Sequence, residues 1–482
     1  MSAAVRALRT YCAAMNAEHA RALRELLGEE GFLVDADRLR GYETPLRQAA
    51  GKAAAVLRPA SAEQVSRAVA YCVRAQLPLI AQSGNTGLVG GGVPDAGGTQ
   101  LILSLDRLNR RIELDADNRS VKVDAGVRLS ALNAALAPQG LWCPIDLGSD
   151  PMIGGMVSTN TGGARFIRYG DMRRQVRALD VVLADDHGTY LRLGSGLRKD
   201  NSALDLKQLF IGAGGNLGVV TGAELEVHRK PAETAAALLV PRDGEAVLAL
   251  LAALEAGAGE FLSAFEGMSQ GALRRTLANI PRLTQPFAGG KIPEYTVLVE
   301  LARGARDEAA PLEELLARIA APLLESGLLR DALVRDETAL WAIRHSMSEG
   351  IRKSGAVVGF DLAVRRADLP RFRARLGALL AREFADFELC DFGHVGDGGL
   401  HYNLVAREGV PAAARVTALR EFVVRHAVEE FGASFSGEHG LGRANQMWYD
   451  RYTPAEVKRL AGGVQALFAP GGLGAFRFGG AP

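Results

Sequence analysis

The stretch QSGNTGLVGGG, Gln82 to Gly92, organises the rest of the chain. It holds five glycines in eleven residues and follows the apolar run LPLIA (77–81), which predicts a buried strand. Glycine lets a backbone approach a ligand closely, and consecutive N–H groups form an anion-binding concavity. The side chains of Ser83, Asn85 and Thr86 are polar but uncharged, which suits a diphosphate held mainly by backbone. A glycine-rich structural turn is the alternative interpretation.

The segments before this loop argue against two common nucleotide ligands. The run AAAVLRPAS (53–61) predicts a strand, and Ser61 predicts the cap of a helix over 62–75. The loop therefore follows a strand–helix–strand unit, whereas Rossmann glycines join a strand to a following helix. No Lys-Ser or Lys-Thr ends the loop, as a Walker A motif requires. NAD and ATP are both disfavoured.

Two more glycine-rich segments follow within the same part of the chain. They are DLGSDPMIGGMVSTNTGGARFIRYG (146–170) and FIGAGGNLGVVTGAELEVHRKP (210–231). Small residues with almost no charge suit either close packing or contact with a flat ligand. Three such loops indicate one extended ligand lying across the loops of an α+β unit.

Length and composition bound the class of protein. A chain of 482 residues should hold two or three domains, and 48% hydrophobic with 23% charged residues is ordinary for a soluble globular protein. A net charge of +1 argues against a nucleic-acid partner. No apolar run is long enough to span a membrane, and the first 30 residues lack the apolar core of a signal peptide. The scattered cysteines favour a reducing cytoplasm: Cys12, Cys72, Cys143 and Cys390.

Composition changes after Pro231, which suggests a domain boundary. Residues 1–231 are assigned to a ligand-binding domain, and 232–425 to a second α+β domain in which predicted strands alternate with predicted helices, one of them over 337–353. The remainder, 426–482, forms a C-terminal segment whose glycine-rich end we expect to be loosely ordered.

The stretch FELCDFGHVGDGGLHYNLV (387–405) predicts a β-hairpin. Asp397-Gly398 is a strong two-residue turn signal, and this turn would pair His394 with His401. The Cβ atoms would then lie roughly 5 Å apart on one face, close enough for two imidazoles to share a metal ion. Asn403 would point to the same face as His401.

The loop GEHGLG adds Glu438 and His439 to this group. Two histidines and a glutamate form a common ligand set for zinc-like divalent metals. A lone histidine is more often structural, but three of the eight histidines, placed at hairpin register and beside a glutamate, favour a metal or catalytic site.

Arg344 and Ser348 lie four residues apart on a predicted helix and would share a face. An arginine among apolar neighbours can bind a substrate carboxylate with two hydrogen bonds, or extend along the surface to reach water. Arg165 and Arg168, with Tyr169, are as consistent with structural ion pairs as with a site.

These motifs resemble the FAD-dependent D-2-hydroxyacid dehydrogenases of the vanillyl-alcohol oxidase/p-cresol methylhydroxylase flavoprotein superfamily, including the D-2-hydroxyglutarate and D-lactate dehydrogenases. The resemblance extends over roughly 57–468 and rests on the three glycine-rich segments together with LSAFE, LWAIR, GHVGDGGLHYNLV and GEHGLG. It implies an α+β fold: a two-part FAD-binding domain of the p-cresol methylhydroxylase type plus a substrate, or cap, domain.

The resemblance also implies a non-covalently bound FAD and a divalent metal, usually zinc. The implied pyrophosphate contacts are Ser83, Gly84, Asn85, Thr86, Gly87 and Leu88. The implied flavin contacts are Ser149, Gly154, Gly155, Ser158, Asn160, Gly163, Gly218 and Val219. The implied metal ligands are His394, His401 and Glu438, with His439 as catalytic base, Arg344 as carboxylate anchor, and Ser348 and Asn403 as further substrate contacts.

The chain departs from the family pattern at three places. Gly359 stands where hydroxyglutarate enzymes have a lysine, which predicts the loss of a cation near the substrate. Gly399 replaces an asparagine of the hairpin, and APGGLGAF (469–476) lacks an asparagine expected near the flavin. The identity of the 2-hydroxy acid therefore stays open.

The expected reaction is oxidation of a D-2-hydroxy acid to the 2-oxo acid by hydride transfer to flavin N5, with an electron acceptor such as a quinone or an electron-transfer protein. A homodimer is one expectation for its assembly. Three alternatives stay open. The first is a related FAD oxidase with a different 2-hydroxy acid, such as lactate, glycolate or a bulkier acid. The second is a flavin-binding subunit of a glycolate/lactate oxidase complex that needs partner subunits. The third is a metal-dependent hydrolase without flavin.

Overall fold

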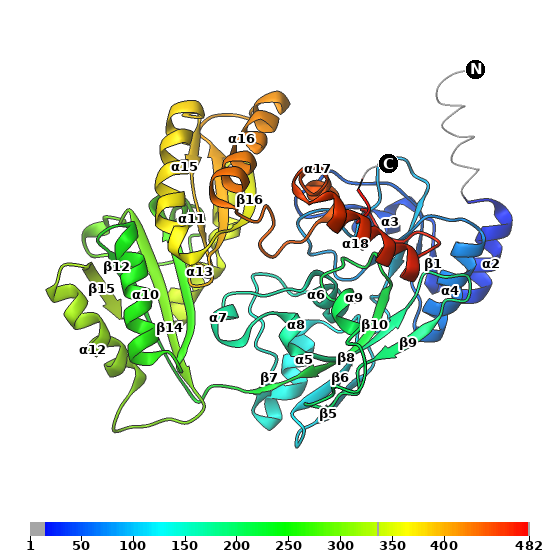
Figure 1. Cartoon of the computed structure of the whole chain (residues 1–482), viewed down its shortest axis with the longest axis horizontal. Coiled ribbons are helices and arrows are strands. Elements are labelled where there is room, and N and C mark those ends of the chain that lie inside the picture. The colour runs from blue at the N-terminus through cyan, green and yellow to red at the C-terminus, as the bar shows by residue number, and fades with distance from the viewer. Residues whose placement is uncertain (1–14, 335–336, 481–482) are drawn as a thin grey trace.

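The computed structural model describes residues 15–334 and 337–480, so Cys12 lies outside the described residues. Two units stand side by side, and the chain returns to the first of them at its end (Figure 1). Both units mix helices and sheets, as the sequence predicted.

The first unit contains two main sheets. One has the order β1-β2-β4-β3, in which β4 runs parallel to both of its neighbours. The other is antiparallel, with the order β5-β6-β10-β8-β9, and β7 pairs with β11 separately. The strands are β1 (Phe32–Leu33), β2 (Ala53–Leu57), β3 (Leu79–Gln82), β4 (Gln100–Ser104), β5 (Ile112–Asp115), β6 (Ser120–Asp124), β7 (Leu141–Trp142), β8 (Val176–Val182), β9 (Tyr190–Leu193), β10 (Val219–Glu226) and β11 (His228–Arg229).

The predicted setting of the first glycine loop is confirmed. The hydroxyl of Ser61 accepts a hydrogen bond from the amide of Gln64 and caps α4, whose apolar side is buried. β3 then leads directly into the loop without a following helix. The helices of this unit are α2 (Ala17–Leu27), α3 (Ala36–Glu43), α4 (Ala62–Arg74), α5 (Leu129–Leu136), α6 (Ile153–Thr159), α7 (Phe166–Tyr169), α8 (Met172–Gln175) and α9 (Lys207–Phe210).

The second unit is built on a single large sheet. Its order is β15-β12-β14-β13-β18-β19-β16, and β17 also pairs with β19. The strands are β12 (Glu233–Pro241), β13 (Leu262–Ser269), β14 (Tyr295–Arg303), β15 (Leu329–Val334), β16 (Val357–Ala363), β17 (Phe387–Leu389), β18 (Phe392–Gly393) and β19 (Gly399–Ala406).

Helices cover both faces of this sheet because side chains alternate along each strand. Leu239 and Val299 belong to the core shared with α10, α12, α15 and α16, whereas Leu238 and Leu298 pack with α11, α13 and α14. The helices are α10 (Gly244–Ala258), α11 (Gln270–Asn279), α12 (Leu312–Glu325), α13 (Glu337–His345), α14 (Met347–Arg352), α15 (Leu369–Glu383) and α16 (Ala413–Phe431).

One predicted helix is in fact two. The sequence predicted a single helix over 337–353, but Ser346 separates α13 from α14. The serine amide is shared between the carbonyls of Ala342 and Ile343, which tightens the last turn of α13. Arg344 and Ser348 therefore lie on consecutive helices.

The C-terminal segment packs back onto the first unit. Helices α17 (Gly442–Tyr452) and α18 (Ala455–Phe468) lie over it in Figure 1. The expectation of a loosely ordered tail is wrong: Leu473 and Phe476 are buried, and the amide of Gly474 donates to the carbonyl of Leu79. The proposed boundary between residues 425 and 426 falls inside α16.

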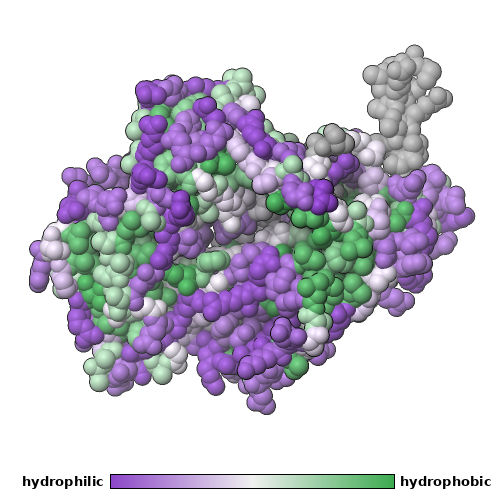
Figure 2. All heavy atoms as spheres, in the orientation of Figure 1, coloured by the Kyte–Doolittle hydropathy of each residue, from purple (hydrophilic) through white to green (hydrophobic). Residues whose placement is uncertain are grey.

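The surface is largely polar, with apolar area where α18 lies (Figure 2). Leu460 and Leu467 are exposed on that helix. Among the described residues, no helix is both long and apolar enough to cross a membrane.

Candidate active site

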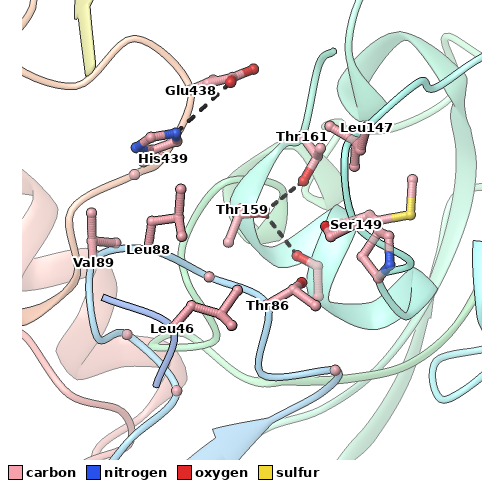
Figure 3. Close-up of a pocket in the computed structure, with 18 of the residues that line it drawn as sticks. Leu46, Thr86, Leu88, Val89, Leu147, Ser149, Thr159, Thr161, Glu438 and His439 are labelled. Carbon is pink, nitrogen blue, oxygen red and sulfur yellow. Dashed lines mark hydrogen bonds and ion pairs between the residues drawn. The ribbon is translucent and has the colours of Figure 1, made fainter. Parts of the chain in front are cut away.

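A cavity of about 710 Å³ lies between the first unit, α13, α14 and the loop after α16. This volume falls in the range of small-molecule sites. Figure 3 shows Glu438 and His439 on one side, with the segments that carry Thr86 and Ser149 opposite them. The cavity collects most of the predicted site residues: Ser83, Gly84, Asn85, Thr86, Gly87, Leu88, Ser149, Gly154, Gly155, Ser158, Gly163, Arg344, Ser348, His394, His401, Glu438 and His439.

The first two glycine-rich segments form one wall of this cavity. A Cβ at Gly84 would lie 3.2 Å from the amide of Met152, and one at Gly155 would lie 3.2 Å from Ser83 Cβ. A Cβ at Gly154 would lie 2.7 Å from Ala125 Cβ. These glycines let the loop and α6 pack backbone against backbone and leave a wall of small side chains. Such a wall fits an extended, flat cofactor held by backbone groups.

Three residues expected at the ligand lie away from this cavity. The amide group of Asn160 donates to Asp171 and its oxygen accepts from the amide of Arg173. Asn160 is also the left-handed C-cap of α6, so it shapes the chain where the second segment turns. Gly218 packs against Val181, and Val219 is fully buried in β10.

Arg344 is a buried residue rather than a surface arginine. Its Nε and Nη2 atoms both lie 2.6 Å from one carboxylate oxygen of Glu266, and the guanidinium lies 4.9 Å from the ring centre of Phe392. No hydrogen bond involves Nη1 within the described residues. The carboxylate thus fixes the guanidinium while leaving one of its donors for a ligand in the cavity.

The predicted hairpin register is wrong, although its two histidines do meet. His401 pairs with Phe392, not with His394, because the connection is longer than two residues. The amides of Asp397 and Gly399 both donate to the carbonyl of His394, which places His394 in the turn. The imidazoles of His394 and His401 still approach, with ring centres 5.2 Å apart.

Glu266 also binds His394. Its second oxygen lies 2.8 Å from His394 Nδ1, so Nε2 is left facing Glu438, whose Oε1 is 3.7 Å away. A carboxylate on one imidazole nitrogen fixes the ring and its tautomer, as it does for metal-binding histidines. Burial acts to lower the pKa of His394, but Glu266 and Glu438 outweigh it and raise this pKa well above its usual value.

The loop carrying Glu438 and His439 is held by Asp361. One oxygen of Asp361 accepts hydrogen bonds from the amides of Glu438 (2.9 Å) and His439 (2.7 Å). Burial would raise the pKa of Glu438, but the surrounding imidazoles, His394 first, lower it. Burial lowers the pKa of His401 well below its usual value, so its imidazole is neutral at pH 7.

These groups form a compact donor set. Donor atoms of His401, Glu438, His439 and Asp361 all lie within 4.8 Å of one another, and His401 Nε2 is 3.5 Å from Glu438 Oε1. Imidazole nitrogens and a carboxylate suit zinc and similar divalent ions, so the residues present fit such a metal. His394 joins this set through its contact with Glu438.

Asn403 lines a smaller neighbouring cavity of about 260 Å³. It pairs with Gly359 across β19 and β16. The expectation that Gly359 leaves this region without a cation is wrong: a Cβ there would lie 3.0 Å from Arg47 Nη1. Arg47 comes from the loop between α3 and β2, far away in the sequence.

Arg165 and Arg168 are structural. Arg165 forms a double hydrogen bond with Glu300 and also pairs with Asp146, while Arg168 donates to the carbonyls of Phe261 and Ala302. Tyr169 is buried beside Trp142. These contacts join the two units beside the cavity.

Sequence reasoning missed Glu266, Asp361 and Arg47. A glutamate within the otherwise apolar strand Leu262–Ser269 was a usable signal, because a buried charge requires a partner. Asp361 in the apolar strand Val357–Ala363 gave the same signal. Arg47 gave none, because nothing in its exposed, irregular segment points to Gly359.

Comparison with known protein families gives two matches. Residues 53–194 match the family described as "FAD binding domain", and residues 230–473 match "FAD linked oxidases, C-terminal domain". Together they include the first two glycine-rich segments and the donor set around Glu438.

Among curated proteins, the chain is similar to the probable mitochondrial D-2-hydroxyglutarate dehydrogenase of Oryza sativa subsp. japonica, with 32% identity covering 95% of this chain and 81% of the relative. It is also 33% identical to D-2-hydroxyglutarate dehydrogenase of Xanthomonas citri pv. viticola, over 86% of this chain and 87% of the relative. The p-cresol methylhydroxylase structure shares the fold, with a TM-score of 0.73, 16% identity and 94% of each chain covered.

Proposed function

Because the chain belongs to the FAD-linked oxidase family that includes the D-2-hydroxyglutarate dehydrogenases, we propose that it is an FAD-dependent dehydrogenase of D-2-hydroxy acids. The reaction is oxidation of the 2-hydroxyl to a 2-oxo group. One observation carries this proposal. The guanidinium of Arg344 and the imidazole of His439 line one cavity, and the glycine-rich segments form its other wall.

The backbone of Ser83–Leu88 and the wall from Ser149 to Gly163 would hold FAD, which would supply the acceptor for the C2 hydride. Arg344 binds the substrate carboxylate through the donor that Glu266 leaves unused. Ser348, on α14, lines the same cavity as Arg344 on α13, and its hydroxyl contacts the bound acid there.

His439 is the general base. Its Nδ1 faces Asp361 at 3.7 Å, and Nε2 takes the proton of the 2-hydroxyl. Asp361 binds the backbone amide of the same residue, so the base is positioned at both its main chain and its ring.

His394, His401 and Glu438 would hold a divalent metal, with zinc fitting the donors best. Such a metal would supply Lewis acidity that lowers the pKa of the substrate hydroxyl. Glu266 binds His394 Nδ1, which leaves Nε2 facing Glu438 as the nitrogen that would bind the metal.

The test is to mix the purified yellow protein, without oxygen, with D- and L-2-hydroxy acids and to follow the flavin absorbance. Bleaching by D acids only is expected. Failure of every 2-hydroxy acid to bleach the flavin would contradict the proposal. A flavin-free absorption spectrum would favour a metal-dependent hydrolase.

The electron acceptor is proposed to be a quinone or an electron-transfer protein. A cytoplasmic location and a homodimer also remain proposals. The exposed leucines of α18 offer one surface for self-association. Reduction of an artificial dye by the purified protein alone would argue against a subunit that works only in a larger complex.

A further inference from the structure

The smaller cavity continues from the candidate active site. The two cavities share seven lining residues, among them Ser348 and His439, which face the substrate in the proposed function. A substrate anchored at Arg344 can therefore extend its far end past these two side chains into the smaller cavity.

Three arginines from three separate elements line this cavity. They are Arg47 from the loop after α3, Arg352 at the end of α14, and Arg420 on α16. Gly359 makes room for the first of them, because a Cβ there would lie 3.0 Å from Arg47 Nη1. Gly359 lies within strand β16 and does not adopt a positive φ, so its backbone does not require glycine.

None of the three arginines forms an ion pair with any described residue; Arg420 instead lies over the ring of Phe360. Elsewhere in the described chain, Arg344, Arg165 and Arg373 each bind a buried carboxylate. Burial lowers the pKa of Arg47, the nearby charge of Arg352 lowers it further, and Asp361 acts in the opposite direction. The side chains of Arg47 and Arg352 keep exposed surface, so an anion can reach them from solvent. Three cations that share one acidic neighbour favour binding of an anion.

Asp361 is the one acidic residue among those that line the smaller cavity. Its carboxylate is already engaged by the amides of Glu438 and His439 and by the hydroxyl of Ser436. Three positive charges against one negative charge leave the cavity with an excess of two positive charges.

We propose that this three-arginine cavity binds the far end of the substrate, and that this end carries two negative charges, as a phosphate group or two carboxylates. The inference rests on the proposed function, with Arg344 binding the C1 carboxylate. It selects, among D-2-hydroxy acids, those with a doubly charged distal group over those with one distal carboxylate or a neutral tail. Gly359 stands where hydroxyglutarate enzymes have a lysine, and in this proposal Arg47 supplies the positive charge there instead.

Flavin reduction is measured with D-lactate, D-2-hydroxyglutarate, isocitrate and D-3-phosphoglycerate, whose tails carry none, one, two and about two negative charges. The kcat/KM should be highest for isocitrate or for D-3-phosphoglycerate. A higher value for isocitrate would indicate two carboxylates at the far end, and a higher value for D-3-phosphoglycerate would indicate a phosphate. Arg47→Met, Arg352→Met and Arg420→Met should each lower that value on the order of 10- to 100-fold and leave D-lactate unaffected. Arg365→Met, at an exposed arginine away from both cavities, is the matched control.

Binding of unreactive anions separates this proposal from the proposed function. Propane-1,2,3-tricarboxylate lacks a hydroxyl, so its affinity for the holoenzyme by calorimetry does not depend on turnover. It should bind more tightly than glutarate, and the arginine variants should remove this advantage. Gly359→Ala, which pushes on the Arg47 guanidinium, should weaken it too. A preference for D-lactate or D-2-hydroxyglutarate, equal losses for all acids, or loss of FAD from Arg47→Met would overturn the proposal.

Discussion

The carboxylate of Glu266 lies 2.6 Å from the guanidinium of Arg344, and its other oxygen holds His394. One residue thus connects the proposed substrate anchor with the proposed metal site. Glu266 lies on β13, on the face of the large sheet against which α13 and its Arg344 pack.

Glu266→Gln should therefore weaken two functions at once. The substitution keeps the shape of the side chain but removes the charge that fixes both partners. We expect metal affinity to fall about 10- to 100-fold, measured by metal content after dialysis. Glu300→Gln is the matched control, because Glu300 is equally buried but binds Arg165 and Trp341. Equal metal loss in both variants would contradict a specific role for Glu266.

His439→Gln tests whether His439 is the general base. The variant should keep FAD but reduce it at least 100-fold more slowly, because general-base catalysis contributes about 10²–10⁴-fold. Stopped-flow absorbance with excess substrate measures this step directly. His345→Gln serves as the comparison, since His345 lines the cavity but binds Asp146. Normal reduction in His439→Gln would show that another group takes the proton.

Arg344→Met should lower kcat/KM for every 2-hydroxy acid, whatever its tail. Loss of a hydrogen bond between charged groups corresponds to about 1.5–3 kcal/mol, or roughly 10- to 150-fold. The variant also leaves Glu266 without its partner, so its thermal stability must be measured alongside. A loss confined to acids with charged tails would instead assign Arg344 to the distal end.

Gly87→Val tests the FAD-binding loop without disturbing the fold. Gly87 lines the main cavity, and a Cβ there meets no atom within 4 Å. Stability of the apoprotein should be unchanged, while FAD content after gel filtration should drop sharply. Gly304→Val is the control, because its Cβ also meets nothing and it lies away from the cavity. Full FAD retention in Gly87→Val would argue against this loop as a cofactor contact.

Asp180 makes stability depend on pH. Burial would raise the pKa of this carboxyl, but hydrogen bonds from Arg111 and Arg192 outweigh it and lower the pKa. A lowered folded-state pKa stabilises the protein above the unfolded value, about 3.9, and this contribution fades as pH falls further. Asp180→Asn should therefore cost roughly 3–5 kcal/mol at pH 7 and about 1 kcal/mol less near pH 3. Denaturant titrations at both pH values measure the difference, which should not grow as the pH is lowered.

The sequence by itself determined the elements that depend on local pattern. Ser61 and the apolar run before Gln82 predicted the helix and strand that present the glycine loop, and both are present. The glycine-rich segments predicted one extended ligand. The histidines of the hairpin and Glu438 predicted one cluster of side chains. Both predictions were possible because each motif lies within a short stretch of sequence. The convergence of these segments on one cavity follows from how the strands and loops pack.

Only the tertiary structure decided what the charged groups do. A hairpin signal could not give the register of His394 and His401, because the turn depends on hydrogen bonds to the His394 carbonyl. Pairing of Arg344 with Glu266, and the approach of Arg47 to Gly359, join residues that no local spacing relates. Buried charges are placed by long-range packing, so the sequence predicted the class of chemistry, whereas the fold determined which side chains can carry it.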